Sequence, residues 1–194
     1  HIMIGMLKTL FSLRGKSSED LLNLPILEDI REQAAMRIQM TASTAAYKSN
    51  HEFFIPMIGF KGIKSTLKFG RSPETGYWLA GMGMLLIVVF NNIEMAYRYG
   101  KLALAMKDQP ESKPVAGRTL VLTMATIWHW KHPLKDFYGN FLEAYQLGLE
   151  TGDHECAAMS AFSHCLYGFL IGKPLDEIYQ ELKTYRTVIQ KLKD

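Results

Sequence analysis

The stretch "GYWLAGMGMLLIVVF", Gly76–Phe90, has no charged residue, and the uncharged run around it extends from Thr75 to Ile93. Such a run can lie in a bilayer, in a large core or between neighbouring helices. A helix of this length rises only about 22 Å, whereas the hydrocarbon layer of a bilayer is about 30 Å thick. The flanking segments "RSPET" and "NNIEMAYRYGK" read as a helix start and a second amphipathic helix, without an aromatic belt or a basic anchor. We therefore expect a buried helix and no membrane span.

The composition is that of a folded protein with a nearly balanced charge. Its 194 residues are 48% hydrophobic, enough for one or two domains with a sizeable core. The net charge of +3, from 22 basic and 19 acidic residues, gives no reason to expect nucleic acid or an anionic membrane as a partner. Two cysteines, Cys156 and Cys165, do not make a disulfide framework, and with 11 methionines and no apolar leader they favour a reducing, cytoplasmic setting. We interpret residues 1–3, "HIM", as a remnant of a cloning vector.

Residues of similar type recur every 41 positions, and we call this spacing the period. Periods of about 20 to 50 residues are typical of tandem repeats. A position where two helix backbones approach closely excludes large side chains, and tyrosine rings can pack between helices with their hydroxyls at the boundary. The small-residue series is Ala35, Gly76, Gly117 and Ala158, the tyrosine series is Tyr97, Tyr138 and Tyr179, and an apolar series is Ile93, Leu134 and Leu175.

Each repeat reads as two antiparallel helices. Ser72, Pro73 and Glu74 supply an N-cap, an N1 proline and an acidic first turn, so a helix is expected over about 73–89. Gly152 and Asp153 read as a helix stop and the next cap. The segment "DQPESKP" is expected to be the longest polar loop. The predicted organisation is a leading helix and link at 4–27, then a single array at 28–192, with pairs at about 28–70, 72–109, 112–151 and 153–192.

Two segments carry residue types found in ligand sites. His154, Cys156, His164 and Cys165 could bind zinc, but their spacing is not that of zinc sites, and His154 and Cys156 would point about 200° apart on a helix. A core thiol and surface histidines are the simpler interpretation. "GFKGIKST", 59–66, lacks the spacing of a phosphate-binding loop and follows no strand. We therefore expect no metal, no cofactor and no catalytic residue.

Aromatic residues at positions that are polar in other repeats are candidates for a partner surface. Trp78 shares its repeat position with Arg37, Thr119 and Ser160, and Tyr99 shares one with Asn140 and Glu181. The alternative is that the side chains of Trp78 and Tyr99 cover a neighbouring repeat or loop. His129 and Trp130, in "HWKH" at a helix end, complete the predicted partner surface.

Several segments together resemble one protein family over about residues 7–192. They are "LRGKSSEDLLNLP", "AAMRIQM", "LKFGRSPETGY", "NNIEMAYRYGKLAL" and "EAYQLGLETGDHECAAMSAFSHCLYGFLIGKPLDEI". They resemble the helical repeat region of large bacterial signalling proteins, which also carry a serine/threonine-kinase-like domain, a P-loop ATPase, a GAF domain and a histidine kinase. The phosphate loop, the phosphorylated histidine box and the ATP lid of that family have no counterparts here.

The resemblance implies an all-α, right-handed superhelix of about four helix pairs, similar to tetratricopeptide arrays. The unit is longer than their repeat of about 34 residues, and their signature is not present as such. The expected function is that of a non-catalytic regulatory scaffold that contacts neighbouring domains or another signalling protein, with a homodimer as an open possibility. Two rivals are a ligand or peptide sensor, marked by a deep pocket near Trp78, His129 or Trp130, and a free-standing enzyme.

Overall fold

The fold is all-helical over the residues that the computed structural model describes, 2–51 and 53–191. Within these residues the only pairing of extended backbone is a single parallel bridge between Ile26 and Arg71. The predicted all-α class is therefore confirmed. His1, part of the interpreted vector remnant, and residue 192, the predicted end of the array, lie outside the described residues.

The helices follow one another with short connections. Their bounds are α1 Ile2–Leu13, α2 Ser18–Leu22, α3 Ile30–Lys48, α4 Phe54–Phe69, α5 Thr75–Phe90, α6 Ile93–Lys107, η1 Pro110–Val115, α7 Ala116–Thr126, η2 Trp128–Trp130, α8 Leu134–Phe137, α9 Gly139–Glu150, α10 His154–Leu170 and α11 Leu175–Lys191, where η marks a 3-10 helix.

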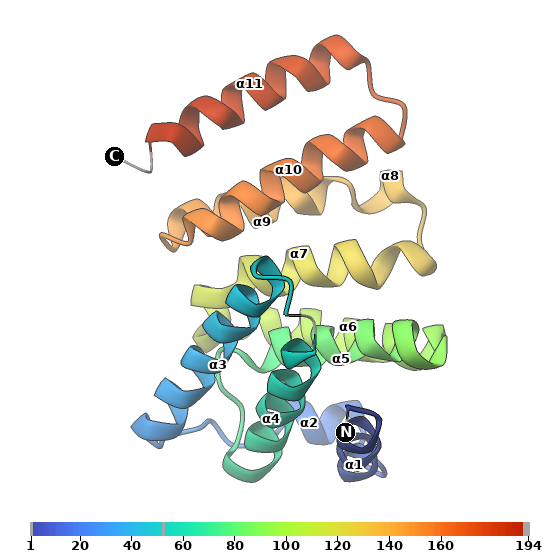
Figure 1. The fold of residues 1–194 in the computed structure, drawn as a ribbon, viewed down its shortest axis with the longest axis vertical. Helices are drawn as coiled ribbons and strands as arrows, with labels where there is room; N and C mark the ends of the chain where they lie inside the picture. The colour runs from blue at the N-terminus through green and yellow to red at the C-terminus, as the bar shows by residue number, and fades with distance from the viewer. Residues whose placement is uncertain (1, 52, 192–194) are drawn as a thin grey trace.

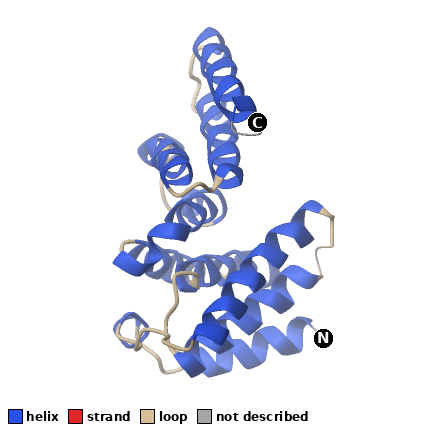
Figure 2. Ribbon diagram, turned by 90° about the vertical axis from the view of Figure 1, so that its left-hand side faces the viewer, coloured by secondary structure: helices blue, strands red, loops and turns tan. Residues whose placement is uncertain are grey.

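Helices α5 to α11 form a stack along the longest axis of the molecule, in which α5 and α6 share one level below α7 and α11 lies at the C-terminal end (Figure 1). Helix α5 packs on α6 and α7, α9 packs on α7 and α10, and α11 packs on α10. Helices α3 and α4 cross this stack at an angle in its N-terminal half, beside α1 and α2. Seen from the side, the C-terminal helices form a narrow column above a broader N-terminal part (Figure 2).

The uncharged run forms α5, which has neighbours on several sides. It packs against α4, α6 and α7, and Trp78, Met82 and Leu86 are almost fully buried. This burial explains how a helix without a polar face is held in water. None of the described helices combines the length and the apolar composition needed to cross a membrane.

Most of the expected helix boundaries hold to within two residues, and the differences have local causes. Helix α5 begins at Thr75 rather than residue 73, because Ser72 forms a turn in which its backbone N–H donates to Oγ1 of Thr75 at 2.9 Å. "DQPESKP" is not a plain loop, since Pro110–Val115 form a 3-10 helix. The stop at Gly152, with φ of +71°, and the cap at Asp153, which accepts from the N–H of Cys156 at 3.0 Å, are as expected.

The backbones of neighbouring helices approach closely at two members of the small-residue series. A Cβ atom on Gly76 would lie 3.0 Å from the carbonyl oxygen of Ala103 in α6. A Cβ atom on Gly117 would lie 3.0 Å from the carbonyl oxygen of Ala144 in α9. Only a glycine permits this separation without a shift of one helix.

Candidate protein-interaction surface

Two of the four residues predicted to form a partner surface are buried. Trp78 is 2% exposed and Tyr99 is 5% exposed, so neither belongs to an exposed partner surface, and their burial agrees with the alternative that they pack against neighbouring segments. The indole of Trp78 lies against Gly62 of α4, where an added Cβ would come within 2.5 Å of Cδ2. The crossing position of α4 therefore covers a residue that comparison of repeat positions had placed at the surface.

The other two residues lie in η2, just after α7, where the structure keeps them accessible. Trp130 is 46% exposed, and the ring of the half-buried His129 lies 5.3 Å from it. Partial burial lowers the pKa of His129, which favours a neutral imidazole at pH 7. The next residue, Lys131, pairs with Glu94 of α6. This segment offers one aromatic face to solvent.

A half-buried aromatic group holds the segment in place. The rings of Trp128 and His132 stack at 4.8 Å, and the hydroxyl of Tyr97 lies 2.8 Å from Nε2 of His132. Because these contacts tie η2 to α6, Trp130 is presented on a fixed backbone rather than on a free loop.

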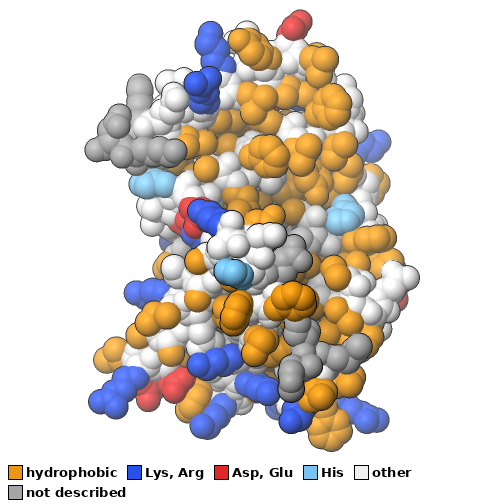
Figure 3. All heavy atoms as spheres, viewed as in Figure 1, with side chains coloured by type: hydrophobic (Ala, Val, Ile, Leu, Met, Phe, Trp, Pro, Cys, Tyr) orange, Lys and Arg blue, Asp and Glu red, His pale blue; other side chains and the backbone are white. Residues whose placement is uncertain are grey.

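A larger apolar surface follows α10, and the sequence reasoning did not identify it. The apolar side chains of this surface recur every three or four residues, which places them on one face of α10. The two most exposed members are Phe162, at 62%, and Phe169, at 58%. We call this surface the α10 stripe; its members are Met159, Phe162, Leu166, Phe169 and Leu170. Figure 3 shows hydrophobic side chains gathered in the part of the molecule where Figure 1 places α10 and α11.

A sequence signal for the α10 stripe exists in retrospect. Glu155 is the only acidic or basic residue between His154 and Leu170 apart from the histidines, so the helix has no strongly polar face. A helix that is apolar on all sides needs neighbours on all sides. The apolar composition of α10 therefore predicts that the helix needs a further packing partner, but it does not predict which face of α10 stays exposed.

The opposite face of α10 carries a polar cluster that joins it to α8 and α11. The hydroxyl of Tyr138 lies 2.7 Å from Nε2 of His164, and Lys173 donates to Glu181 at 2.6 Å. Burial lowers the pKa of His164, whereas burial and the nearby Glu181 carboxylate raise the pKa of Tyr185 to about 12. Both shifts favour neutral forms at pH 7, so the cluster is a hydrogen-bonded seam whose ion pairs are those of Lys173 with Glu181 and Glu177.

The cysteines and histidines considered for zinc do not converge. His154 is exposed, whereas Cys156, His164 and Cys165 are buried. Among the described residues, no three His, Cys, Asp or Glu side chains are grouped so that they could hold a metal. Burial raises the pKa of Cys156 to about 11 and also raises that of Cys165, so both are protonated thiols at pH 7. The segment 59–66 lies inside α4 and offers no loop to a phosphate.

An ion-pair network ties the N-terminal helices to α7 and α10. Arg118 of α7 donates to Oδ1 of Asp153 at 2.7 Å and to Oε2 of Glu155 at 2.9 Å. It also donates to the hydroxyl of Thr44 in α3 at 3.1 Å, and Lys48 of α3 pairs with Glu155. Burial acts to raise the pKa of Glu155, but the hydrogen bonds from Lys48 and Arg118 outweigh it and the pKa is lowered. The network fixes where α3 lies on the stack.

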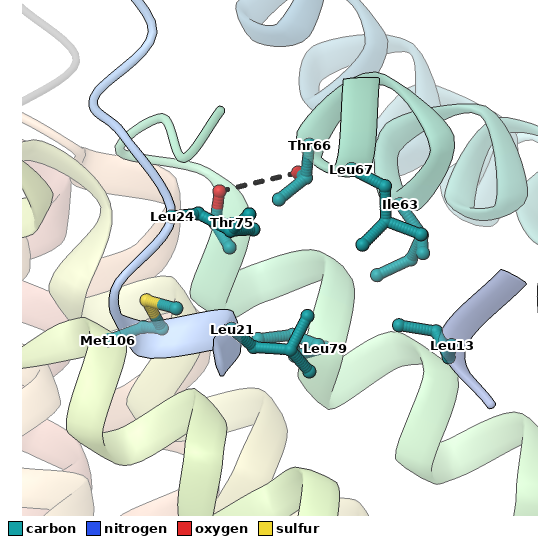
Figure 4. A pocket seen from close by; sticks show the side chains of 9 residues that line it. All are labelled: Leu13, Leu21, Leu24, Ile63, Thr66, Leu67, Thr75, Leu79 and Met106. Atoms are coloured by element: carbon teal, nitrogen blue, oxygen red, sulfur yellow. Dashed lines mark hydrogen bonds between the residues drawn. The ribbon is translucent and has the colours of Figure 1, made fainter. Parts of the chain in front are cut away.

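One small cavity lies between α1, α2, α4, α5 and α6 (Figure 4). Its volume is about 10 Å³, and its walls are apolar apart from the hydroxyls of Thr66 and Thr75, which lie 3.4 Å apart. A space of this size holds about one water molecule, whereas ligand pockets measure about 300 to 1,000 Å³. None of Trp78, His129 and Trp130 lines it.

Comparison with known proteins gives one informative similarity. The chain is 25% identical over 158 residues to hybrid signal transduction histidine kinase G of Dictyostelium discoideum, and the alignment covers 80% of this chain but 5% of that protein. This distant similarity supports a signal-transduction context, here with a protein that is not bacterial. No protein family model matches the sequence. No solved structure matches it either.

Proposed function

We propose that this chain is a non-catalytic helical-repeat segment of a multidomain signal-transduction kinase, where it mediates contacts with neighbouring domains or with another signalling protein. The repeat is a tetratricopeptide-like α–α superhelix with the period found in the sequence. The similarity to a hybrid histidine kinase supports the context. The ATPase, the serine/threonine-kinase-like domain and the cytoplasmic location of the parent protein belong to the same proposal.

The helix positions support the proposed period. Helices α5 and α7 begin one period apart, at Thr75 and Ala116, and α6, α8 and α11 begin at Ile93, Leu134 and Leu175. The contacts repeat as well. The close approach of Gly76 to Ala103 recurs between Gly117 and Ala144, with both partners shifted by one period. Such recurrence is expected when each unit packs on the next in the same way.

Side-chain contacts recur with the same shift. The hydroxyl of Tyr97 lies 2.8 Å from Nε2 of His132. One period further along, the hydroxyl of Tyr138 lies 3.5 Å from Nζ of Lys173. Helices α3 and α4 do not follow this scheme, since they cross the stack. We therefore propose three regular units over about 72–191, with the first pair, 28–70, packed across them.

The α10 stripe is the observation that carries the contact function. Exposed apolar patches of several neighbouring side chains are typical of interaction sites, and aromatic residues contribute strongly to such interfaces. Phe162 and Phe169 stand on a helix that is held from behind by the Tyr138–His164 seam. A rigid apolar ridge of this kind suits a protein partner better than a polar ligand.

Replacement of Phe162 and Leu166 by alanine tests this function. In the parent signalling protein, we expect the double variant to weaken binding of the neighbouring domains at least tenfold and to change kinase output. Ile38→Ala is the matched control, because Ile38 is 68% exposed on α3, away from the stripe. Unchanged binding and kinase output in the double variant would contradict the proposal. Turnover of ATP by the chain alone would contradict its non-catalytic part.

The rival function is a sensor for a small molecule or peptide in the groove of the superhelix. The cavity of about 10 Å³ gives it no support, because that space cannot hold such a ligand. A ligand that binds near Trp130 with micromolar affinity and is displaced by Trp130→Ala would favour the sensor.

A further inference from the structure

The second helix of each unit presents the same positions to the helix that follows it. In α6, Tyr97 meets Trp128 and His132, with a ring separation of 5.1 Å to Trp128. Three residues on, an added Cβ at Gly100 would lie 3.0 Å from Cγ2 of Ile127. These positions of α6 therefore form its interface with α7 and η2.

The same positions in the next unit form the interface with α10. The rings of Tyr138 and His164 stack at 4.2 Å, and those of Phe141 and Tyr167 lie 4.5 Å apart. Tyr138 and Phe141 stand one period after Tyr97 and Gly100. In both units a tyrosine hydroxyl meets an imidazole nitrogen of the following segment.

In α11 these positions are exposed. Tyr179 and Leu182 stand a further period along and are 62% and 44% exposed, and Leu175, in register with Ile93 and Leu134, is 67% exposed. The terminal unit of a repeat array is soluble when its outer face is polar, and this face of α11 is apolar instead. This face of α11 therefore has the residue types of the two internal interfaces, but no described residue of the chain covers it as α10 covers Tyr138 and Phe141.

We infer that Leu175, Tyr179 and Leu182 form a docking face for a partner helix of the α10 type. The partner is an amphipathic helix with an imidazole opposite Tyr179 and an aromatic or aliphatic side chain opposite Leu182. The α10 helix is the template for this occupant, because it brings His164 and Tyr167 to these positions of the preceding unit. In α6 the same positions are covered by η2 and by His132 in the turn after it. The inference rests on the proposed repeat and its period and concerns a different surface from the α10 stripe.

A chain extended by one helix tests the inference. Helix α9 ends at Glu150 and α11 ends at Lys191, one period later. A second copy of residues 151–172, which carries α10 with its turn and cap, is therefore fused directly after Lys191. We expect the extended chain to unfold several degrees higher than the original chain, and the amides of α11 to exchange more slowly with deuterium.

Two variants make the result specific. Tyr179→Ala with Leu182→Ala should abolish most of the gain in the extended chain and change the original chain little, because both side chains are exposed there. Gln180→Ala, on another exposed part of α11, should leave the gain intact. No gain, or a gain that survives the double substitution, would overturn the inference.

Sedimentation of the original chain tests whether a second copy of the chain, rather than a partner helix, binds this face. We expect the same sedimentation for the original chain and for its Tyr179→Ala, Leu182→Ala variant. A dimer that the double substitution dissociates would show that this face binds a second copy, which would also overturn the inference. Neither readout measures kinase output or substitutes a residue of the α10 stripe, so failure here is distinct from failure of the proposed function.

Discussion

Gly117 lies at a point where even a methyl group does not fit. An added Cβ would come within 2.9 Å of Sγ of Cys156 and 3.0 Å of the carbonyl oxygen of Ala144. A backbone oxygen cannot move aside unless α9 moves with it. We expect Gly117→Ala to lower the free energy of unfolding by about 1 to 3 kcal/mol, the usual cost of overpacking, as measured by urea denaturation.

Gly81 provides the matched control for Gly117. It lies inside α5, and an added Cβ would have no atom within 4 Å. Alanine is favoured over glycine in a helix by about 0.5 to 1 kcal/mol, so Gly81→Ala should stabilise the chain by that amount. The same loss of stability at both glycines would mean that close packing at Gly117 is not the cause.

For single residues, the sequence pattern shows which residue types recur, but it predicts the packing environment of each residue less well. The recurrence of small residues drew attention to Gly76 and Gly117, where helices do approach closely. The same comparison of repeats placed Trp78 at the surface. That error arose because the position of α4 depends on packing between distant segments, including the space left by Gly62, which a local pattern does not encode.

Between helices, Arg118 connects three elements with one guanidinium group. It bridges Asp153 and Glu155 at the start of α10 and Thr44 in α3. Removal of one partner from a largely buried ion pair leaves the other charges uncompensated and costs about 3 kcal/mol. We expect Arg118→Ala to destabilise the chain by about this amount and to raise deuterium exchange in α3 by mass spectrometry more than in α5.

An exposed ion pair gives the comparison for Arg118. Lys113 and Glu150 lie 3.9 Å apart, and both side chains are more than half exposed. Exposed pairs contribute between about 0 and 1 kcal/mol, so Lys113→Ala should have little effect on unfolding or on exchange in α3. If Lys113→Ala and Arg118→Ala had equal effects on unfolding and on exchange in α3, Arg118 would not be the residue that links α3 to α7 and α10.

Helices are predicted from this sequence more reliably than their contacts. Caps and stops such as Asp153 and Gly152 act through neighbouring backbone groups, so a short segment contains the whole signal. The break between α8 and α9 and the exposure of the α10 stripe depend on which helices pack together. The exposure of Trp130 agrees with the predicted position at the surface, whereas the α10 stripe was found only in the structure.

For the whole molecule, burial stays high from α5 through α10 and drops at α11, the last helix. Helix α5 has eight buried residues, whereas Ile178 is the buried residue of α11 among those described. In the proposed array each unit packs mainly on its neighbours, so stability is approximately a sum of local terms and units with little burial open first. The molecule should then not unfold as one cooperative body.

Native-state hydrogen exchange measures this difference between α11 and the helices before it. We expect the amides of α11 to exchange through openings of clearly lower free energy than those of α5. Low urea concentrations should change exchange in α11 little, since its opening exposes little apolar surface, whereas exchange in α5 should show the urea dependence of global unfolding. If α5 and α11 instead exchange with the same free energy and the same urea dependence, the chain unfolds as a single unit. The prediction that successive helical pairs open separately would then be wrong.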